Sequence, residues 1–161
     1  MTRLRLLVGT VAIAAAAVNF LLIRWMLGFG FMGRTLIPGL ADFSPTYNHG
    51  VSFGLLTPDG ATGRHLLIAL LAVITLAVAA AAWRTTTMLT AMGYALILGG
   101  ALGNLSDRLL NDGAVFDFLA LHLGHIPLFI CNFPDIVITA GVILLFAGLL
   151  FEERGAKGVA A

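Results

Sequence analysis

The sequence predicts an all-α membrane protein with four transmembrane helices and a small extracytoplasmic platform of loops and β-like segments. Hydrophobic residues make up 60% of the 161 residues and charged residues only 11%, with a mean hydropathy of +1.01. In soluble domains roughly a quarter of the residues are charged, so this chain cannot cover a surface that faces water on all sides. The formal net charge of +1, without any basic run, gives no indication of nucleic-acid binding.

Four long apolar runs account for the helices. A helix crosses the hydrocarbon core, about 30 Å thick, with roughly 17 to 25 residues. Long apolar runs without alternation favour helices, which satisfy their own backbone groups in lipid. The expected spans are about 6–23, 66–83, 88–103 and 136–151. With no repeat or linker between them, residues 1–161 are expected to form a single integral membrane domain.

The first run has two interpretations. Arg3 and Arg5 precede an apolar core and an alanine run, which is the pattern of a secretory signal peptide. The run is long for such a signal, however, and three more spans follow it. We therefore expect an uncleaved first helix.

The positive charges predict the orientation of the spans, because Lys and Arg near span ends favour the cytoplasm. One side carries Arg3, Arg5, Arg84, Arg154 and Lys157, whereas the other carries Arg34, Arg64 and Arg108 over longer loops. Both termini and the turn after Trp83 should then be cytoplasmic. The connections 24–65 and 104–135 should face outward.

Polar residues gather in one stretch, residues 99–135, which holds four of the eight acidic side chains, namely Asp107, Asp112, Asp117 and Asp135. Asp117 lies in an apolar run, where an acid is costly unless it has a partner or a task. Asp135 follows Pro134, a residue that suits the first position of a helix, where the helix dipole favours a carboxylate. Asp112 belongs to a sequence typical of a solvated turn.

Two of these acids suggest an aspartic dyad. Carboxylates about 4 Å apart repel by about 4 kcal/mol at an effective dielectric near 20, which corresponds to roughly three pK units. Such a pair shares one proton. The ionised member then activates water, and the protonated member donates to the carbonyl under attack. Sequence spacing alone does not establish that Asp117 and Asp135 meet.

Neighbouring residues allow structural or functional interpretations. Gly99 and Gly103 form a small-xxx-small pair that permits close helix packing. Asn104 and Arg108 share a helix face if the third helix continues. Asp107 and Arg108 are either interfacial anchors, with Asp107 paired to Arg108, or groups that orient a site.

The outer connection 24–65 contains turn signals at Pro38-Gly39 and Pro58-Asp59-Gly60. It is either a membrane-skimming loop or a platform of short strands for a lipid-embedded substrate.

Other chemistries are possible on these residues. His122 and His125 with Asp117 would suit a metal, but the intervening sequence does not indicate a long helix, and we expect no metal or cofactor. A nucleophilic Cys131 would need a positioned base, so a buried apolar role is expected for it. A small transporter or scaffold would carry its acids within the spans, whereas here they cluster at one interface.

Four blocks in order resemble signal peptidase II, the bacterial lipoprotein signal peptidase, an aspartic endopeptidase of the inner membrane. They are residues 48–54 (NHGVSFG), 99–108 (GGALGNLSDR), 115–118 (VFDF) and 132–135 (NFPD). The resemblance implies that Asp117 and Asp135 are catalytic. It further implies that Asn48, Asn104, Arg108 and Asn132 line the site, with Asp107, Gly50 and Phe53 in supporting positions.

The same resemblance implies the substrate, a prolipoprotein cut before its diacylglyceryl-modified cysteine. It implies a multi-pass protein of the inner membrane, in contact with lipids and acting as a monomer, with its site near the outer face. Two departures stand out: Asn19 occupies the region where the family usually carries an acid in its first helix, and Pro134 replaces the usual alanine. A divergent paralogue, or a transporter or scaffold without protease activity, is the alternative.

Overall fold

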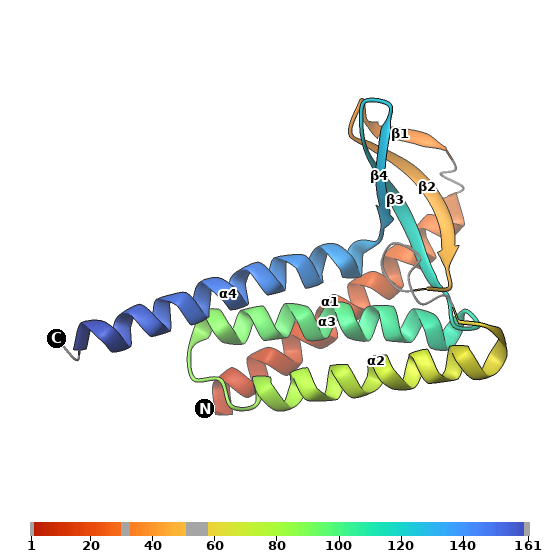
Figure 1. Cartoon of the computed structure of the whole chain (residues 1–161). Helices are drawn as coiled ribbons and strands as arrows, with labels where there is room; N and C mark the ends of the chain where they lie inside the picture. Colours follow the sequence, from red (N-terminus) through yellow and green to blue (C-terminus); the bar gives the residue numbers. More distant parts are fainter. Residues whose placement is uncertain (1, 30–32, 51–57, 160–161) are drawn as a thin grey trace.

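The computed structural model describes residues 2–29, 33–50 and 58–159 and has the predicted fold class, four long helices with a small antiparallel sheet (Figure 1). The helices are α1 (Thr2–Phe29), α2 (Gly60–Ala82), α3 (Met88–Leu110) and α4 (Phe133–Val159). The strands are β1 (Arg34–Ile37), β2 (Ala41–Asn48), β3 (Val115–Leu123) and β4 (Ile126–Cys131).

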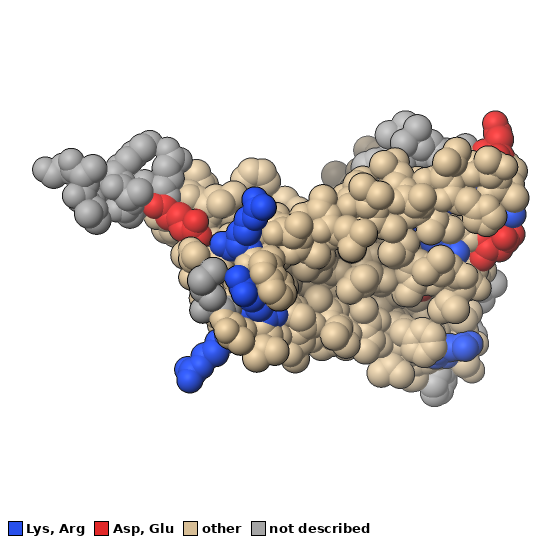
Figure 2. All heavy atoms as spheres, turned by 90° about the horizontal axis from the view of Figure 1, so that it is seen from below, with Lys and Arg blue, Asp and Glu red and all other residues tan. Residues whose placement is uncertain are grey.

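All four helices are long and apolar enough to cross a membrane. Figure 2 shows charged side chains gathered toward the two ends of the molecule, with an uncharged band between them. The helices extend beyond the spans expected from hydropathy: α2 begins at Gly60 and α3 continues to Leu110. Hydropathy detects only the part of a helix that faces lipid. Asp107 and Arg108 are charged but belong to α3, because their side chains are buried against protein.

The helix α3 is the centre of the bundle and packs against α1, α2 and α4. Glycines allow the close approach, as the small-xxx-small pattern predicted. A Cβ atom on Gly99 would lie 2.6 Å from Cβ of Ala15 on α1, and one on Gly100 would lie 2.5 Å from the carbonyl oxygen of Pro134 on α4. Neighbouring glycines of α3 therefore face two different helices.

The sheet has the order β1-β2-β3-β4, and every neighbouring pair is antiparallel. The outer connection 24–65 thus contributes two strands, β1 and β2, as the platform interpretation expected. Residues 115–131 form a β-hairpin that the sequence analysis did not predict, because their apolar run lacks clean alternation. Phe43, Phe116 and Phe118 are buried together with Ile23 of α1, which anchors the sheet to the bundle.

The β3–β4 hairpin connects the end of α3 to the start of α4. Figure 1 shows the sheet rising from this end of the bundle, away from the N-terminus and the α2–α3 turn. In a strand, successive side chains point to opposite faces, so Asp117 points away from the face that Phe116 and Phe118 pack on. The hairpin therefore brings Asp117 to the end of the bundle where α4 begins with Asp135.

Candidate active site

A cavity of about 560 Å³ lies where the sheet meets the helices. It is lined by the two proposed catalytic acids and the four proposed supporting residues, namely Asp117, Asp135, Asn48, Asn104, Arg108 and Asn132. The remaining wall is largely apolar and includes Leu71, Ile74 and Val78 of α2. The apolar contribution of α2 was not foreseen, since nothing in its uniform sequence marks which residues face inward.

Asp117 is almost completely buried, with 3% of its surface exposed, yet both carboxyl oxygens have partners. The side-chain amide of Asn48 donates to Oδ2 at 3.0 Å, and that of Asn132 donates to Oδ1 at 2.8 Å. Asn48 is itself held by the backbone N–H of Gly50, which donates to its Oδ1 at 3.0 Å. Two amides from different elements thus orient one carboxyl group, and Gly50 supports one of them.

Asp135 lies in the first turn of α4 and takes part in a capping box. Its backbone N–H donates to Oδ1 of Asn132 at 2.9 Å, and the backbone N–H of Asn132 donates to Oδ2 of Asp135 at 3.2 Å. The helix begins at Phe133, so Pro134 occupies its second position rather than the first. A proline is tolerated there as well, because the first turn has no intrahelical acceptor for its N–H groups.

Asn132 and Asn104 connect the two acids. The Asn132 side-chain amide donates to Oδ1 of Asn104 at 3.0 Å as well as to Asp117. Asn104 in turn donates to Oδ1 of Asp135 at 3.0 Å. Asp117 and Asp135 therefore belong to one continuous hydrogen-bond network, although they come from a strand and a helix.

Burial raises the pKa of Asp117 from 3.8 to about 6. This value is the net result of several causes: burial is the largest, the charge of Asp135 also raises the pKa, and the hydrogen bonds from Asn48 and Asn132 and the charge of Arg108 lower it. Desolvation disfavours the carboxylate more than its donors favour it. A carboxyl group with this pKa can hold or release a proton near neutral pH, as acid–base catalysis requires.

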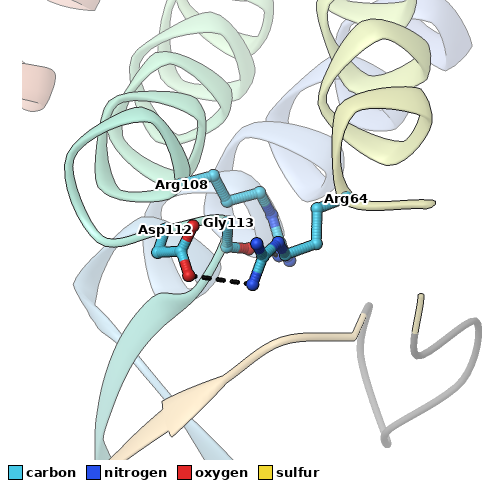
Figure 3. Close-up of polar contacts among 4 residues, drawn as sticks. All are labelled: Arg64, Arg108, Asp112 and Gly113. Carbon is cyan, nitrogen blue, oxygen red and sulfur yellow. Dashed lines mark hydrogen bonds and ion pairs between the residues drawn. The ribbon is translucent and has the colours of Figure 1, made fainter. Parts of the chain in front are cut away.

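Arg108 braces the cavity through backbone carbonyl groups. It is 5% exposed and donates to the carbonyl oxygen of Gly50 at 2.6 Å. It also donates to the carbonyl oxygen of Gly113 at 2.8 Å, and Figure 3 shows Arg108 and Gly113 side by side. These carbonyl partners were missed in the sequence, since backbone acceptors leave no residue-type signal. The guanidinium group of Arg108 thus links the segment just after β2 to the segment just after α3. This link supports the position of Asn48.

The suggested pairing of Asp107 with Arg108 is not among the ion pairs of the described residues. Asp107 is buried and lies near Asn19 of α1 and the backbone of Phe116. Successive residues on a helix point about 100° apart, and here their surroundings differ. Asp107 therefore faces α1 and the sheet, whereas Arg108 faces the cavity.

Asp112 lies outside the cavity. Its carboxylate accepts from Arg64 at 2.8 Å, and its side chain is 78% exposed, in agreement with the predicted solvated turn (Figure 3). The turn has positive φ angles, 51° at Asp112 and 87° at Gly113. A Cβ at Gly113 would lie 3.0 Å from the Arg64 side chain, so glycine serves both the backbone conformation and the contact.

The remaining candidates lie in different places. Phe53 is outside the described residues. Nε2 of His122 lies 3.2 Å from Oδ2 of Asp42 on the sheet, and not beside Asp117.

Cys131 is buried and lines the cavity. Burial, together with the charges of Asp135 and Asp117, raises the pKa of its thiol to about 11. A thiol with this pKa is protonated at neutral pH, which argues against a nucleophilic role.

Comparison with known proteins identifies the family. A family model described as signal peptidase (SPase) II matches residues 8–151. The chain belongs to the signal peptidase II family. This match begins within α1, ends within α4 and includes α2, α3 and the sheet. It confirms the resemblance that the four sequence blocks indicated.

Several relatives of this signal peptidase II chain are named lipoprotein signal peptidase. The one from Rhodopseudomonas palustris (strain ATCC BAA-98 / CGA009) is 37% identical over 162 residues, 96% of each protein. The one from Methylobacterium radiotolerans is 42% identical over 120 residues, 73% of this chain and 66% of that protein. The chain therefore spans about two thirds of the Methylobacterium relative and nearly all of the Rhodopseudomonas relative.

A solved structure described as a bacterial membrane enzyme has the same fold. It superposes with a TM-score of 0.70 at 23% identity, covering 89% of this chain and 92% of that chain. A second structure with the same description gives a TM-score of 0.67 at 22% identity. Together with the family match, this fold makes the chain a multi-pass protein of the bacterial inner membrane and a member of a peptidase family.

Proposed function

We propose that this chain is an aspartic endopeptidase that removes signal peptides from prolipoproteins, cutting before the diacylglyceryl-modified cysteine, with Asp117 and Asp135 as its dyad. One observation carries the assignment of residues: Asn132 donates to Asp117 with its side chain and to Asp135 with its backbone. A single residue therefore positions both carboxyl groups in the wall of the same cavity. The names and coverage of the relatives support the substrate.

The surroundings of the two acids suggest different roles. Asp135 lies at a helix N-terminus and accepts from Asn104 and from the Asn132 backbone, which fixes the position of its carboxyl group. It is the base that takes a proton from the attacking water. Asp117, with its pKa near 6, is the acid that protonates the scissile carbonyl oxygen as the water oxygen bonds to the carbonyl carbon.

The intermediate then collapses. The carbon–nitrogen bond breaks, the proton taken up by Asp135 passes to the leaving amine, and the hydroxyl proton returns to Asp117. Each acid thus regains its starting protonation state, and no covalent intermediate forms with the protein. Arg108 supports the geometry through Gly50 and Gly113 rather than by contact with either carboxylate.

The cavity suits a substrate that arrives through the bilayer. Its polar end holds the acids, and its apolar wall is formed by residues of three membrane helices, including Leu71 of α2, Ile97 of α3 and Ile138 of α4. Such a surface matches an apolar signal segment and lipid chains. We propose that the chain acts as a monomer, and the charge distribution supports cytoplasmic termini with the site near the outer face.

The alternative without protease activity is less well supported. A small transporter would need polar groups along the spans, whereas the acids of this cavity cluster at one end of the bundle. The family and the names of the relatives likewise favour a peptidase.

Cleavage by the purified protein tests the proposal. A precursor with a diacylglyceryl cysteine should be cut on the amino side of that cysteine, and the unmodified precursor should be cut poorly. A chelator should leave the rate unchanged. An intact lipidated precursor under conditions where a known relative cleaves it would reject the proposed function.

A further inference from the structure

Two membrane helices each present a single face to the apolar part of the cavity. The lining residues are Leu71, Thr75 and Val78 of α2 and Ile97, Ala101 and Leu105 of α3. In each helix they lie three or four positions apart, and residues with this spacing share one face. A third side is formed by Ile138 and Thr139 of α4. The cavity thus continues from the acids between three helices, and we call this part the membrane groove.

The membrane groove extends well below the acids. Asn104, which donates to Asp135, lies seven residues after Ile97 on α3. At 1.5 Å per residue, the groove therefore reaches about 10 Å below Asn104 along the helix axis. This length, about two helical turns, suits a segment of a substrate rather than a single side chain.

The two sides of the groove do not close over its floor. The central helix α3 packs against both α2 and α4, whereas among the described elements α2 and α4 share no comparable contact. Ile74 of α2 lines the cavity and is still 50% exposed. Thr139 of α4 also lines the cavity and is exposed. The groove is therefore open between α2 and α4, where an apolar segment in the bilayer can enter it.

The deep part of the groove restricts the conformation of its occupant. Among the described residues that line it, the two hydroxyl groups already donate within their own helices, Thr75 to the carbonyl oxygen of Leu71 and Thr139 to that of Asp135, each at 2.8 Å. No side-chain donor is left there for the carbonyl groups of an extended peptide. A peptide in an apolar environment must satisfy its own backbone groups, which a helix does.

Ala101 makes a recess in the floor. It lies four residues from Ile97 and four from Leu105, on the same face of α3, and its side chain is much smaller than theirs. The residue is partly exposed, so the space above its methyl group belongs to the cavity. A bulky side chain of a neighbouring helix would fit between the two larger floor residues, as ridges fit into grooves when helices pack.

We propose that the membrane groove binds the apolar part of the signal segment as a helix, and that Ala101 is a specificity-determining residue that accepts one of its bulky side chains. This inference rests on the proposed function, which supplies a substrate with an apolar segment before the cut. An amphipathic or apolar helix in a groove is a common mode of peptide recognition. The polar groups at Asn104 and beyond then receive the end of the segment, next to the acids.

A change of size at Ala101 tests the recess. Affinity for a diacylglyceryl precursor is measured in an Asp135→Asn background, so that the measurement does not depend on cleavage. Ala101→Leu fills the recess and should weaken binding about tenfold. One precursor from a series with single large-to-alanine changes in its apolar segment should restore the affinity of this variant. Ala69→Leu is the matched control, because Ala69 is exposed on α2 and does not line the cavity.

Photo-crosslinking locates the segment without filling the recess. A benzophenone side chain replaces Ile74, which lines the cavity, or Leu70, which is equally exposed but does not line it. The first should crosslink to the peptide of the signal segment, and the second should crosslink at least about tenfold less. Crosslinks to the acyl chains alone would show that the groove holds lipid and would overturn the proposal, as would equal crosslinking at both positions.

The size test has its own contrary results. Unchanged affinity in Ala101→Leu, an equal loss in Ala69→Leu, or the absence of any restoring precursor would each contradict the role of Ala101. Failure of the proposed function looks different. If the segment crosslinks at position 74 and the size effects are seen, but the unaltered enzyme does not cut the precursor, the proposed function fails while the helix-binding groove stands.

Discussion

Asn132 and Asp135 cap each other at the start of α4, each accepting a hydrogen bond from the backbone N–H of the other, at 2.9 and 3.2 Å. The acid of this capping box is also one of the two carboxyl groups of the proposed dyad. The beginning of the helix and the position of a reacting group are therefore set by the same two residues. Changes at Asn132 can separate the two roles.

Replacement of Asn132 by serine should reduce activity while preserving the helix start. Serine is a good N-cap residue, but it has no amide to donate to Asp117 and Asn104. Loss of these two hydrogen bonds should lower the unfolding temperature, and kcat/KM should fall at least about a hundredfold. Thermal unfolding in detergent and precursor cleavage measure the two effects.

The alanine variant is the matched comparison. Asn132→Ala loses the cap as well, which costs about 1 kcal/mol and should lower the unfolding temperature by roughly 2–4 °C below that of the serine variant. Full activity of the serine variant would show that the bridging amide has no role.

The two acids should behave as one catalytic unit. Asp117→Asn and Asp135→Asn should each abolish single-turnover cleavage, and the double variant should be little worse, because effects within a unit are not additive. Asp112→Asn is the control, since Asp112 is exposed and pairs with Arg64 at the surface, where such pairs contribute about 0–1 kcal/mol. Substantial cleavage by either dyad variant would contradict the aspartic mechanism.

The raised pKa of Asp117 predicts a pH dependence of stability. The folded-state pKa of about 6 exceeds the ordinary value of 3.8, so between these pH values the folded protein binds more protons than the unfolded chain. The free energy of unfolding should therefore decrease as the pH rises from about 4 to about 6, by at most about 3 kcal/mol, and then level off.

Asp117→Asn should remove this slope. The unfolding temperature of the unaltered protein is expected to fall more than that of the variant between about pH 4.5 and pH 7.5. Comparing the two slopes cancels any constant loss from altered hydrogen bonds. Parallel curves would show that Asp117 does not take up a proton in this range.

The contact between α3 and α4 should be sensitive to added volume at Gly100. A Cβ there would lie 2.5 Å from the Pro134 carbonyl oxygen and 2.6 Å from Cγ1 of Ile138. Gly100→Ala should push the helices apart, weaken the bond between Asn104 and Asp135, and destabilise the protein by about 1–3 kcal/mol. Gly9→Ala is the control, because a Cβ there meets nothing within 4 Å. Equal stability of the two variants would contradict this packing.

The ends of α2 test the orientation. Asp59 lies just before α2, Thr86 lies in the turn after it, and both are exposed. In a Cys131→Ala background, Asp59→Cys should react with a membrane-impermeant thiol reagent from outside intact cells, and Thr86→Cys only after the membrane is opened. Labelling of both from the same side would contradict the expected topology.

The sequence by itself determined the membrane class, the four helices and the identity of the polar cluster. These properties depend on local composition: about 20 apolar residues are needed to cross the bilayer, and buried acids are rare enough there to mark a site. The four motif blocks also indicated the family, which the family match confirmed. The nature of the outer connection remained open, since short apolar runs suit strands and membrane-lying loops equally well.

Only the tertiary structure decided which polar groups meet. Asp117 and Asp135 share a network because Asn132 donates to both, and Arg108 bonds to backbone carbonyls of Gly50 and Gly113 rather than to Asp107. Asn132 and Asp117 are 15 residues apart, and Arg108 and Gly50 are 58 apart. These contacts depend on chain reversals and on backbone acceptors, which no residue pattern encodes. The apolar wall from α2 was likewise decided by packing, because a uniformly apolar helix does not reveal which of its faces meets protein and which meets lipid.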